Sequence, residues 1–483
     1  MIGYEIVHYL YSLVPSVAWP FLLGLAKIAF ILGVSLLFFA PVFVLFERRQ
    51  SAMVQDRVGP MQGGIKLPRA IIDNIQNLQL GAFVVALVCT VMAVVCLVQM
   101  AMGLGEAALF TEPFFGVRHT WNGLFFVFAA LAPVHFVMWF VLPELFTHDR
   151  LTIFGGLHAL FDAIKAFTKR DFVPPHGDKL LFALAPIIAM IPAFALGAVL
   201  PFGPTLYPGH LLEQMPPGGF ADGMAIPLQV ASLNVGILYM FAIGGTGIIG
   251  AAIAGYASDN KFALLGGLRA ASQMVSYEVT LGLALVACFM MYGSLRLEDM
   301  VVWQSGHVWG ICYPPLLLAF ILFQTASIAE YKRVPFDAPE GESEIVAGFF
   351  LEYGTGKWLM YMIGEFLEVG TSSMLIAAIF FGGWDVPFLH DGGWEFFGHR
   401  FDLLGTNFAI LSEVLNSHVA VTAVRIVAFI LKAFLLGVLS IQIRWTLPRF
   451  RYDQIMSLCW KLILPLSLAN VLLTGIWILA FQD

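Results

Sequence analysis

Four carboxylates crowd one short stretch of this sequence. The segment "AEYKRVPFDAPEGESEIVAG" at 329–348 places Asp337, Glu340, Glu342 and Glu344 within eight positions. Carboxylates held close together titrate as a coupled group, because each ionisation disfavours the next. Such a group can take up or release protons when the charge beside it changes. The alternative interpretation is a charge run on a solvated surface.

The same stretch contains residues that restrict its shape. Pro335 and Pro339 stiffen the backbone, and Gly341 allows it to turn. We therefore expect a stiffened acidic loop.

A further carboxylate lies inside an apolar run. Glu278, in "LLGGLRAASQMVSYEVTLGLALV", sits about one turn inside a predicted membrane span. A charge at that depth costs up to a few kcal/mol unless it is paired, hydrated or protonated. We expect a functional role for Glu278, with an ion pair to Arg269 as the structural alternative. In another span Arg425 and Lys432 share a helix face and are expected to line a polar interior, although Lys432 alone could snorkel to an interface.

The elements that position these groups must lie in a membrane. Of the 483 residues, 59% are hydrophobic and 12% are charged, which leaves too little polar surface for a soluble globule of this size. Because one span needs about 20 apolar residues, we predict an all-α polytopic membrane protein with about ten transmembrane helices. The apolar runs lie near 21–46, 81–103, 122–145, 180–201, 226–257, 274–293, 308–329, 358–384, 421–446 and 456–481.

Positive charges alternate between the loops. The loops 47–80, 146–179, 258–273, 330–357 and 444–455 hold 18 Lys and Arg, whereas the loops between them hold only Arg118, Arg296 and Arg400. Under the positive-inside rule, the first set is cytoplasmic and both termini lie outside. The acidic loop is therefore expected on the cytoplasmic side.

Two shorter segments have recognisable helix patterns. Residues 157–170 predict an amphipathic helix on the membrane surface, with Pro174 and Pro175 as its stop. Gly247, Ala251 and Gly255 recur every four residues inside an apolar run, which indicates close helix packing more than a phosphate loop.

The sequence offers no group that could carry an electron. The five cysteines form no CxxC motif, and no two histidines have the i, i+4 spacing of a metal or haem pair. We expect the cysteines to be small buried residues. Any redox chemistry must then use electrons supplied by another subunit.

The segment after the first span is basic. In "ERRQSAMVQDRVGPMQGG", Glu47 lies at the membrane edge and Arg57 precedes a turn at Gly59-Pro60. Taken alone, this segment is equally well explained as a topology signal facing lipid headgroups.

Together these segments resemble the H-subunit family of proton-translocating NADH:quinone oxidoreductase, respiratory complex I. The resemblance rests, in chain order, on "DRVGP", "FDAIKAF" with "DKLLFALAP", "LNVGILYMFAI", "LLGGLRAASQMVSYEV", "AEYKRVPFDAPEGESEIVAGFFLEYG" and "LKAFLLGVLSIQIRWTLPRFRYDQIMSLCWKLILPLSLAN". It covers nearly the whole chain except about 64–154 and 385–420.

The resemblance implies a role within an assembly. Family members form the heel of the membrane arm and most of the membrane-embedded entrance to the quinone tunnel. The implied partners are peripheral-arm quinone-site subunits, small and antiporter-like membrane-arm subunits, and lipids, with no nucleic acid. FMN and iron–sulfur clusters belong to partner subunits, quinone is the substrate, and this chain holds no cofactor or metal of its own. The implied location is the bacterial cytoplasmic (inner) membrane.

The resemblance also implies site residues. Glu278 maps onto the family's lateral chain of acidic residues, with Glu352 and Glu365 as further members. The residues expected to form the quinone tunnel and its coupling to protons are Glu47, Arg57, Asp162, Lys165, Arg269, Glu278, Arg333, Asp337, Glu340, Glu342, Glu344, Glu352 and Glu365.

This chain departs from the family pattern in two places. Residues 64–154 are an insertion with two apolar spans, so the membrane domain is expected to contain eight family helices plus a hairpin that packs on the outer flank of the heel. The family aspartate is assigned to Asp162, because Lys165 follows it and the chain runs on into "DKLLFALAP"; Asp73, in a similar segment, is the rival. In the acidic loop, 329–357, Tyr331 and Lys332 stand where the family more often has Thr and Asn.

Two other functions stay open. One is the anchoring subunit of a membrane-bound hydrogenase or a ferredoxin-linked relative, which would use similar helices. The other is a free-standing ion transporter, for which inverted repeats would be expected.

Overall fold

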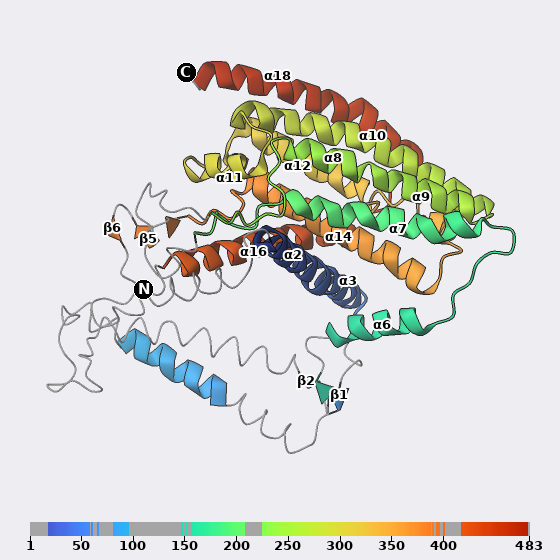
Figure 1. The fold of residues 1–483 in the computed structure, drawn as a ribbon, viewed down its shortest axis with the longest axis horizontal. Helices are drawn as coiled ribbons and strands as arrows, with labels where there is room; N and C mark the ends of the chain where they lie inside the picture. The colour runs from blue at the N-terminus through green and yellow to red at the C-terminus, as the bar shows by residue number, and fades with distance from the viewer. Residues whose placement is uncertain are drawn as a thin grey trace.

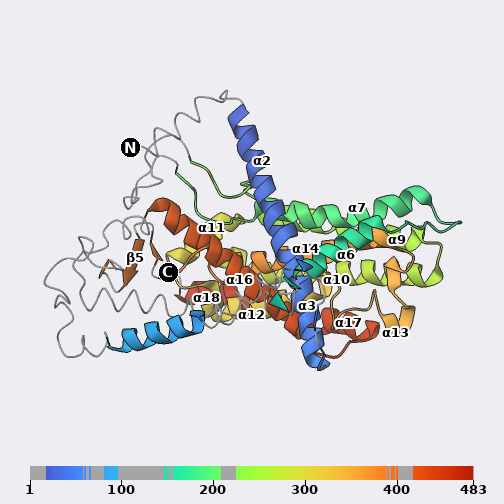
Figure 2. The same ribbon diagram turned by 90° about the horizontal axis from the view of Figure 1, so that it is seen from below.

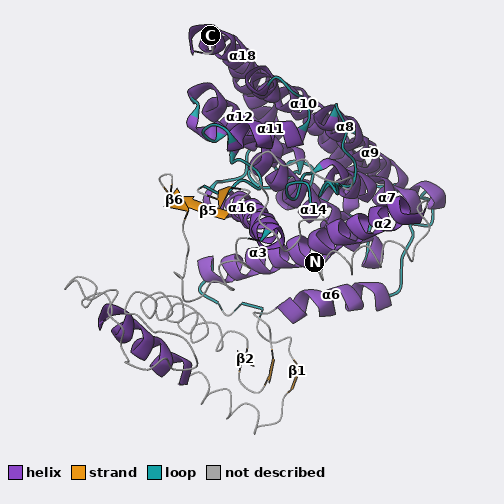
Figure 3. Cartoon of the chain, turned by 60° about the vertical axis from the view of Figure 1, so that its left-hand side comes forward, coloured by secondary structure: helices purple, strands orange, loops and turns teal. Residues whose placement is uncertain are grey.

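Helices make up nearly all of the chain that the structure describes (Figures 1 and 3). The computed structural model describes residues 18–57, 59–60, 65–66, 81–95, 146–147, 150–151, 156–207, 225–387, 389–390, 393–396, 399–400 and 417–481. The α-helices are α2 (Ala18–Leu32), α3 (Ala40–Val54), α6 (Gly156–Thr168), α7 (Lys179–Ala195), α8 (Gly236–Gly244), α9 (Thr246–Ala257), α10 (Lys261–Tyr292), α11 (Leu297–Ser305), α12 (Pro314–Glu330), α13 (Glu342–Ile345), α14 (Thr355–Phe380), α16 (His418–Thr446), α17 (Tyr452–Leu458) and α18 (Leu464–Phe481).

Short helical turns and a further helix complete the helical elements. The π-helical turn η1 (Gly33–Phe39) joins α2 to α3, and η9 (Cys459–Ile463) joins α17 to α18. The 3-10 turns are η4 (Leu196–Val199), η6 (Gly310–Cys312) and η7 (Gly348–Phe350). Gly81–Val95 forms a separate apolar helix.

The prediction of an all-α polytopic membrane protein is confirmed. Six helical segments in the described ranges are long and apolar enough to cross a membrane: Lys179–Val199, Gly236–Ala257, Lys261–Tyr292, Thr355–Phe380, His418–Thr446 and Tyr452–Phe481. Each coincides with a predicted apolar run. The runs 21–46 and 308–329 correspond to α2–η1–α3 and to the shorter α12. The run 81–103 is helical over its described part, and the run 122–145 lies outside the described residues.

Two of the predicted boundaries are wrong. Most of 258–273, predicted as a loop, is the first part of α10. The Asn260 side chain caps this helix by accepting a hydrogen bond from the Phe262 N–H at 2.9 Å. The polar residues between 261 and 273 therefore belong to the helix, although they lie outside the apolar run. The run 226–257 becomes helical only at Gly236. Its first residues instead pair with the segment after α7, where the Phe202 N–H donates to the Leu228 carbonyl at 3.1 Å.

Helix α14 lies at the centre of the bundle. In the most apolar 18-residue stretch of α14, 83% of the residues are buried inside the protein. The corresponding stretches of the other five spans are 22–56% buried. It packs against α7, α12 and α16 (Figure 1). Charged side chains on α14 are therefore surrounded by protein.

The α2–η1–α3 segment crosses the other helices steeply (Figure 2). It is held against them by the fully buried Phe39 and Phe43. Phe39 packs where Gly370 of α14 leaves room, and Phe43 packs where Gly437 of α16 does so. This packing places the C-terminal half of α3, with Glu47, beside α14 and α16.

The predicted amphipathic helix is present as α6. It lies alongside α3 (Figure 3) and packs on α3 and α14. Leu160, Phe161, Ile164 and Phe167 are exposed on it. These apolar side chains form the surface expected of a helix that lies on a membrane.

The small-residue run packs closely, as predicted. The Gly255 position faces the backbone of Ala263 and Gly267 on α10, and the Gly250 position faces Ala189 on α7. The prediction for the cysteines is only partly confirmed. Cys89, Cys288 and Cys459 are buried, but Cys312 is exposed because η6 lies in a connection outside the helices.

Short strands occur in two places. β1 (Ile65–Lys66), β2 (Phe146–Thr147) and β3 (Arg150–Leu151) form an antiparallel sheet in the order β1-β3-β2. This sheet joins the two ends of the predicted insertion 64–154. The other sheet, β4 (Leu389–His390), β5 (Gly393–Phe396) and β6 (His399–Arg400), lies between α14 and α16 in the sequence.

Candidate functional site

The acidic loop folds back against α10 after α12 ends. The Gln273 amide on α10 donates to the carbonyls of Ala329 and Phe336, both at 2.7 Å. The Phe336 N–H also donates to the Arg333 carbonyl at 2.8 Å. Gln273 is fully buried. These bonds fix the first half of the loop, so the side chains that follow have defined positions.

The second half of the loop meets α10 by close backbone contact. A Cβ at Gly266 would lie 2.6 Å from the Cα of Gly348, so a side chain there would collide with the loop. Gly348 itself has φ +62°, a conformation that favours glycine, and a Cβ there would collide with the Pro339 carbonyl. The loop therefore keeps its shape through two glycines.

Arg333 binds carboxylates from two helices. Its guanidinium donates to Glu47 of α3 at 2.5 Å and lies 3.7 Å from Glu365 of α14. It also stacks on the Phe366 ring at 4.1 Å. Arg444 of α16 pairs with the same Glu47. Four distant segments of the chain thus meet in one charge network.

This network borders a cavity of about 350 Å³, which we call the loop cavity. Its charged and polar lining includes Glu47, Lys332, Arg333, Asp337, Glu340, Glu365 and Arg444. Its apolar lining includes Phe350, Trp358, Met362 and Phe366. A cavity of this size with apolar walls and a few converging polar groups is the usual form of a small-molecule site.

Burial perturbs two acids of the loop cavity. It raises the pKa of Asp337 to about 6, although Arg449, bonded to that carboxylate at 2.6 Å, lowers the pKa. Burial also raises the pKa of Glu340 well above its usual value, and the charges of Glu365 and Asp337 raise it further. Asp337 is therefore set to change protonation near pH 6, and Glu340 is harder to ionise than an exposed glutamate.

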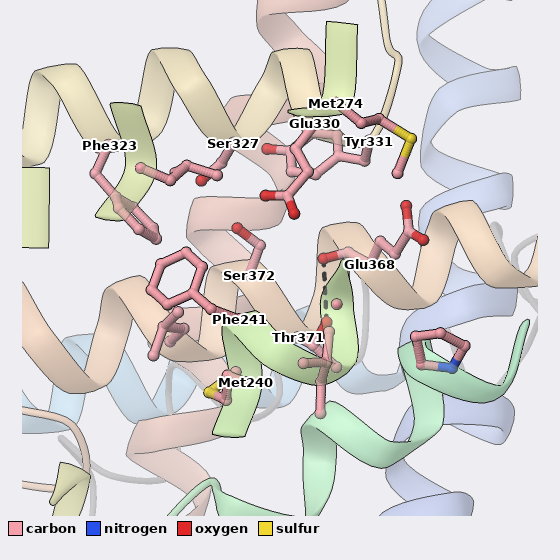
Figure 4. Close-up of a pocket in the computed structure, with 15 residues that line it drawn as sticks. Met240, Phe241, Met274, Phe323, Ser327, Glu330, Tyr331, Glu368, Thr371 and Ser372 are labelled. Carbon is pink, nitrogen blue, oxygen red and sulfur yellow. Dashed lines mark hydrogen bonds between the residues drawn. The ribbon is translucent and has the colours of Figure 1, made fainter. Parts of the chain in front are cut away.

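A second, smaller cavity of about 70 Å³ lies deeper among the helices (Figure 4), and we call it the inner cavity. Glu330 from the end of α12 and Glu368 from α14 point into it from opposite sides (Figure 4). Hydroxyl groups of Ser327, Thr371 and Ser372 also line it. The rest of the lining is mainly apolar, so it holds two carboxylates within largely apolar walls.

The junction of α8 and α9 makes room for three carboxylates. A Cβ atom added at Gly244 would lie 3.9 Å from a carboxylate oxygen of Glu330, and one added at Gly245 would lie 2.9 Å from an oxygen of Glu278. A Cβ atom added at Gly247 would lie 4.0 Å from an oxygen of Glu368. Larger residues at this "GGTG" junction would crowd these oxygens. Glu278 of α10 is thus brought to the same region as the inner cavity.

Tyr331 lines the inner cavity and does not line the loop cavity. Its hydroxyl donates to Ser440 at 3.4 Å, and the Gln324 amide donates to the same oxygen at 2.9 Å. A smaller cavity shares Tyr331 with the inner cavity and Arg333 with the loop cavity, and Ser440 also lines it. This smaller cavity therefore lies between the other two. Polar groups therefore continue from one cavity to the other.

The other predicted site residues lie outside both cavities. Asp162 of α6 pairs with Arg48 at 2.5 Å, and Lys165 is exposed on the same helix. Arg57 is exposed and bonds to Gln55 at 2.7 Å. Asp73, the rival of Asp162, lies outside the described residues.

The remaining loop residues have separate partners. Arg269 pairs with Glu344 at 2.7 Å and not with Glu278. The ion pair between Arg269 and Glu278, which was the structural alternative for Glu278, therefore does not form. Glu352 accepts from the Asn260 amide at 2.8 Å. Glu342 begins α13, and its side chain lies outside the described part.

Sequence reasoning missed Glu330 and Glu368. Two signals were available: Glu330 opens the acidic loop, and Glu368 follows Glu365 by three residues in an apolar run. At that spacing both would lie on one side of a helix. What the sequence did not reveal was that α12 and α14 face each other across a cavity.

Arg425 and Lys432 serve a different region. Lys432 donates to the carbonyls of Phe381, Gly383 and Asp385 at 2.8, 3.1 and 2.5 Å. Arg425 donates to the Leu389 carbonyl at 3.0 Å. Both cations therefore hold the segment after α14.

Comparison with known proteins shows the family to which the chain belongs. A family model described as NADH dehydrogenase matches residues 147–475. The NADH-quinone oxidoreductase H-subunit 1 of Cytophaga hutchinsonii is 38% identical over 333 residues, which are 69% of this chain and 86% of that protein. The H-subunit 2 of Geobacter sulfurreducens is 40% identical over 333 residues, and the H-subunit of Leptospira biflexa is 39% identical over 336, each with the same two coverages. The chain therefore belongs to the H-subunit family of NADH-quinone oxidoreductase and is a membrane subunit of the complex I enzyme.

Proposed function

We propose that the loop cavity is the membrane-embedded part of a quinone tunnel and that the inner cavity begins a chain of acids that couples quinone reduction to proton translocation. The observation that carries this proposal lies on α14. Glu365 lines the loop cavity, and Glu368, one turn further along the same buried helix, lines the inner cavity. One rigid element therefore presents acids to both cavities.

The lining of the loop cavity suits a quinone. The aromatic and apolar side chains Phe350, Trp358 and Phe366 can contact an apolar ring and tail, while Arg333 and Arg444 can donate to carbonyl oxygens. Reduction of a quinone to a quinol takes up two electrons and two protons. Each step changes the charge in a poorly hydrated space, so the coupled acids around it must respond.

The chemistry that moves electrons belongs to partner subunits in this proposal. Peripheral subunits carrying FMN and iron–sulfur clusters deliver electrons at the loop side, and this chain forms a wall and a gate. Neighbouring small and antiporter-like membrane subunits continue the acidic chain. Lipids surround the remaining helix faces.

We also propose an orientation in the bacterial cytoplasmic membrane. α6, α13 and the start of α14 lie towards one end of the molecule, while α11, β5 and the end of α18 lie towards the other (Figures 1 and 2). The loops rich in Lys and Arg belong to the first end, which is therefore cytoplasmic under the positive-inside rule. Both termini would then be periplasmic. The insertion 64–154 would form a hairpin on the outer flank of the heel.

A photoreactive quinone tests the tunnel. The native assembly is extracted in mild detergent through a tag on this chain, and NADH oxidation with a soluble quinone is measured with and without a quinone-site inhibitor. It is then irradiated with an azido-quinone, and labelled peptides are mapped. We expect inhibitor-sensitive turnover, with labels on α3, 331–341 or α14 that the inhibitor prevents.

Two results would contradict the proposal. One is labelling of this chain only at its other end, around α11, in an assembly with full NADH:quinone activity. The other is turnover driven by hydrogen or ferredoxin and not by NADH, which would point to the related hydrogenase-type enzymes.

A further inference from the structure

Lys332 is a buried cation that lines the loop cavity. It follows Glu330 by two residues, where the chain leaves α12 and turns with φ +57°. A left-handed conformation is uncommon for a residue with a long side chain and persists when its surroundings impose it. The side chain lines the loop cavity and is only 7% exposed.

Unlike its neighbour Arg333, Lys332 forms no ion pair with a described carboxylate. Arg333 forms ion pairs with Glu47 and Glu365. For Lys332, by contrast, none of the described carboxylates forms an ion pair, and the ammonium lies 5.5 Å from the centre of the Phe349 ring. A flexible four-carbon stem lets such an ammonium reach more than one partner.

Lys332 shares the loop cavity with Glu340 and Glu365, and it follows Glu330 by two residues at the end of α12. Burial alone lowers the pKa of Lys332, but Glu368, Glu365, Glu340 and Glu330 together outweigh burial and raise it. Glu340 and Glu365 line the loop cavity, whereas Glu330 and Glu368 line the inner cavity. One ammonium thus interacts with acids of both.

Some of these acids also have spare acceptors. Glu365 Oε1 and Glu368 Oε2 are buried and have no hydrogen-bond partner within the described structure. A buried carboxylate oxygen without a donor is costly, so a cation able to approach it is stabilising.

We propose that Lys332 is a shared counter-ion that couples the ionisation of Glu340 and Glu365 in the loop cavity to that of Glu330 and Glu368 in the inner cavity, a role that rests on the function proposed above. When the acids of one cavity are ionised, the ammonium is drawn towards them and away from the other cavity. Lys332 acts as a positioning residue through the acids and does not touch the reacting atoms.

Other charged groups border the same space, and each has its own partner. Glu47 is held by Arg333 and Arg444, and Asp337 by Arg449. These pairs limit how far the groups can respond to Lys332. The coupling therefore depends on the four acids named in the proposal.

Three variants of the whole assembled complex test this role. Lys332→Gln removes the charge, Lys332→Arg keeps it, and Lys261→Gln is a matched control at an exposed lysine on α10. NADH:quinone turnover is measured against pH. Each preparation is normalised to NADH oxidation with ferricyanide, which takes electrons at the flavin and reports assembly.

For Lys332→Gln we expect the acid limb of the pH profile to move up by about 0.5 to 1 pH unit. Without the cation, ionised acids lose stabilisation, and the pKa of Glu340 rises further. We expect Lys332→Arg to restore the normal profile and Lys261→Gln to leave it unchanged.

Two outcomes would overturn the role of Lys332. An unshifted profile in Lys332→Gln would show that its charge is not felt by the acids. An equal defect in Lys332→Arg and Lys332→Gln would show that packing and not charge matters. In both cases, inhibitor-sensitive turnover of the unaltered complex would still stand, so failure here is distinct from failure of the tunnel proposal.

Discussion

At the scale of single residues, two glutamates one turn apart on α14 face different cavities. Glu365 lies beside Arg333 in the loop cavity, and Glu368 faces Glu330 across the inner cavity. A helix rises about 5.4 Å per turn, so this spacing carries the acidic groups a short step along the helix axis. A change of charge at one cavity is thereby close enough to affect the other.

Asp337 predicts a pH-dependent loop. Burial raises its pKa to about 6, so the docked loop binds the proton more tightly than an opened loop, in which the carboxylate is exposed. Protonation as pH falls through that value removes the cost of a buried charge and therefore stabilises the docked loop. We expect hydrogen exchange in 331–341, corrected for its intrinsic rate, to be slower at pH 5 than at pH 7. Asp337→Asn, which carries no charge at either pH, should lose this pH dependence.

Asp453→Asn is the control, because the Asp453–Arg451 pair is exposed. It should not alter exchange in the loop. If exchange in the unaltered loop does not slow between pH 7 and pH 5, the buried charge of Asp337 does not affect the stability of the docked loop.

The sequence predicted the presence of acids better than their partners. It singled out the loop carboxylates and Glu278, because a cluster of acids and a single acid inside an apolar run can both be recognised without a structure. It could not show that Arg269 binds Glu344, or that Glu330 and Glu368 meet. Those contacts join segments tens or hundreds of residues apart and depend on how the helices pack.

At the scale of elements, α10 is the support on which the acidic loop rests. Gln273 binds the loop through its amide, and Gly266 allows the backbone at Gly348 to come close. Helix α10 also carries Glu278. The loop and an acid of the membrane region are therefore attached to one rigid rod.

Gly266→Ala should displace the loop. The added methyl group would overlap the backbone of Gly348, and overpacking of this kind typically costs about 1–3 kcal/mol. We expect lower NADH:quinone turnover per flavin and faster hydrogen exchange at 339–350. The two measurements should change together, because both depend on the docked loop.

Gly282→Ala is a matched control on the same helix, because no atom lies within 4 Å of the position that the added methyl group would occupy. It should leave turnover and loop exchange unchanged. If Gly266→Ala behaved like Gly282→Ala, close contact with α10 would not be what shapes the loop.

Apolar runs predicted which segments are helices but not where those helices end. α10 extends 13 residues before the predicted run at 274, because Asn260 caps it and polar residues continue the helix beyond the apolar part. Conversely, 226–235 is apolar but pairs with the segment after α7. Hydrophobicity reports contact with lipid or core, whereas helix ends depend on caps and local backbone bonds.

At the scale of the whole molecule, α6 and the start of α14 lie towards one end, and α11 and β5 lie towards the other (Figure 1). Lys432 and Arg425 hold the segment that follows α14. The exposed apolar faces of α6 and α18 fit contact with lipid or neighbouring subunits. These faces and the long apolar helices fit a multi-pass membrane protein.

The central claim is that acids of the inner cavity couple quinone reduction to proton movement. The most direct test compares the purified complex in vesicles with Glu278→Gln and Glu368→Gln, measuring inhibitor-sensitive NADH:quinone turnover and proton translocation together. Glu298→Gln, at the other end of the molecule, is the control. We predict that both activities fall by about tenfold in the first two variants, while NADH oxidation with ferricyanide and the control are unchanged. Unchanged turnover and proton translocation in Glu278→Gln and Glu368→Gln would contradict the account.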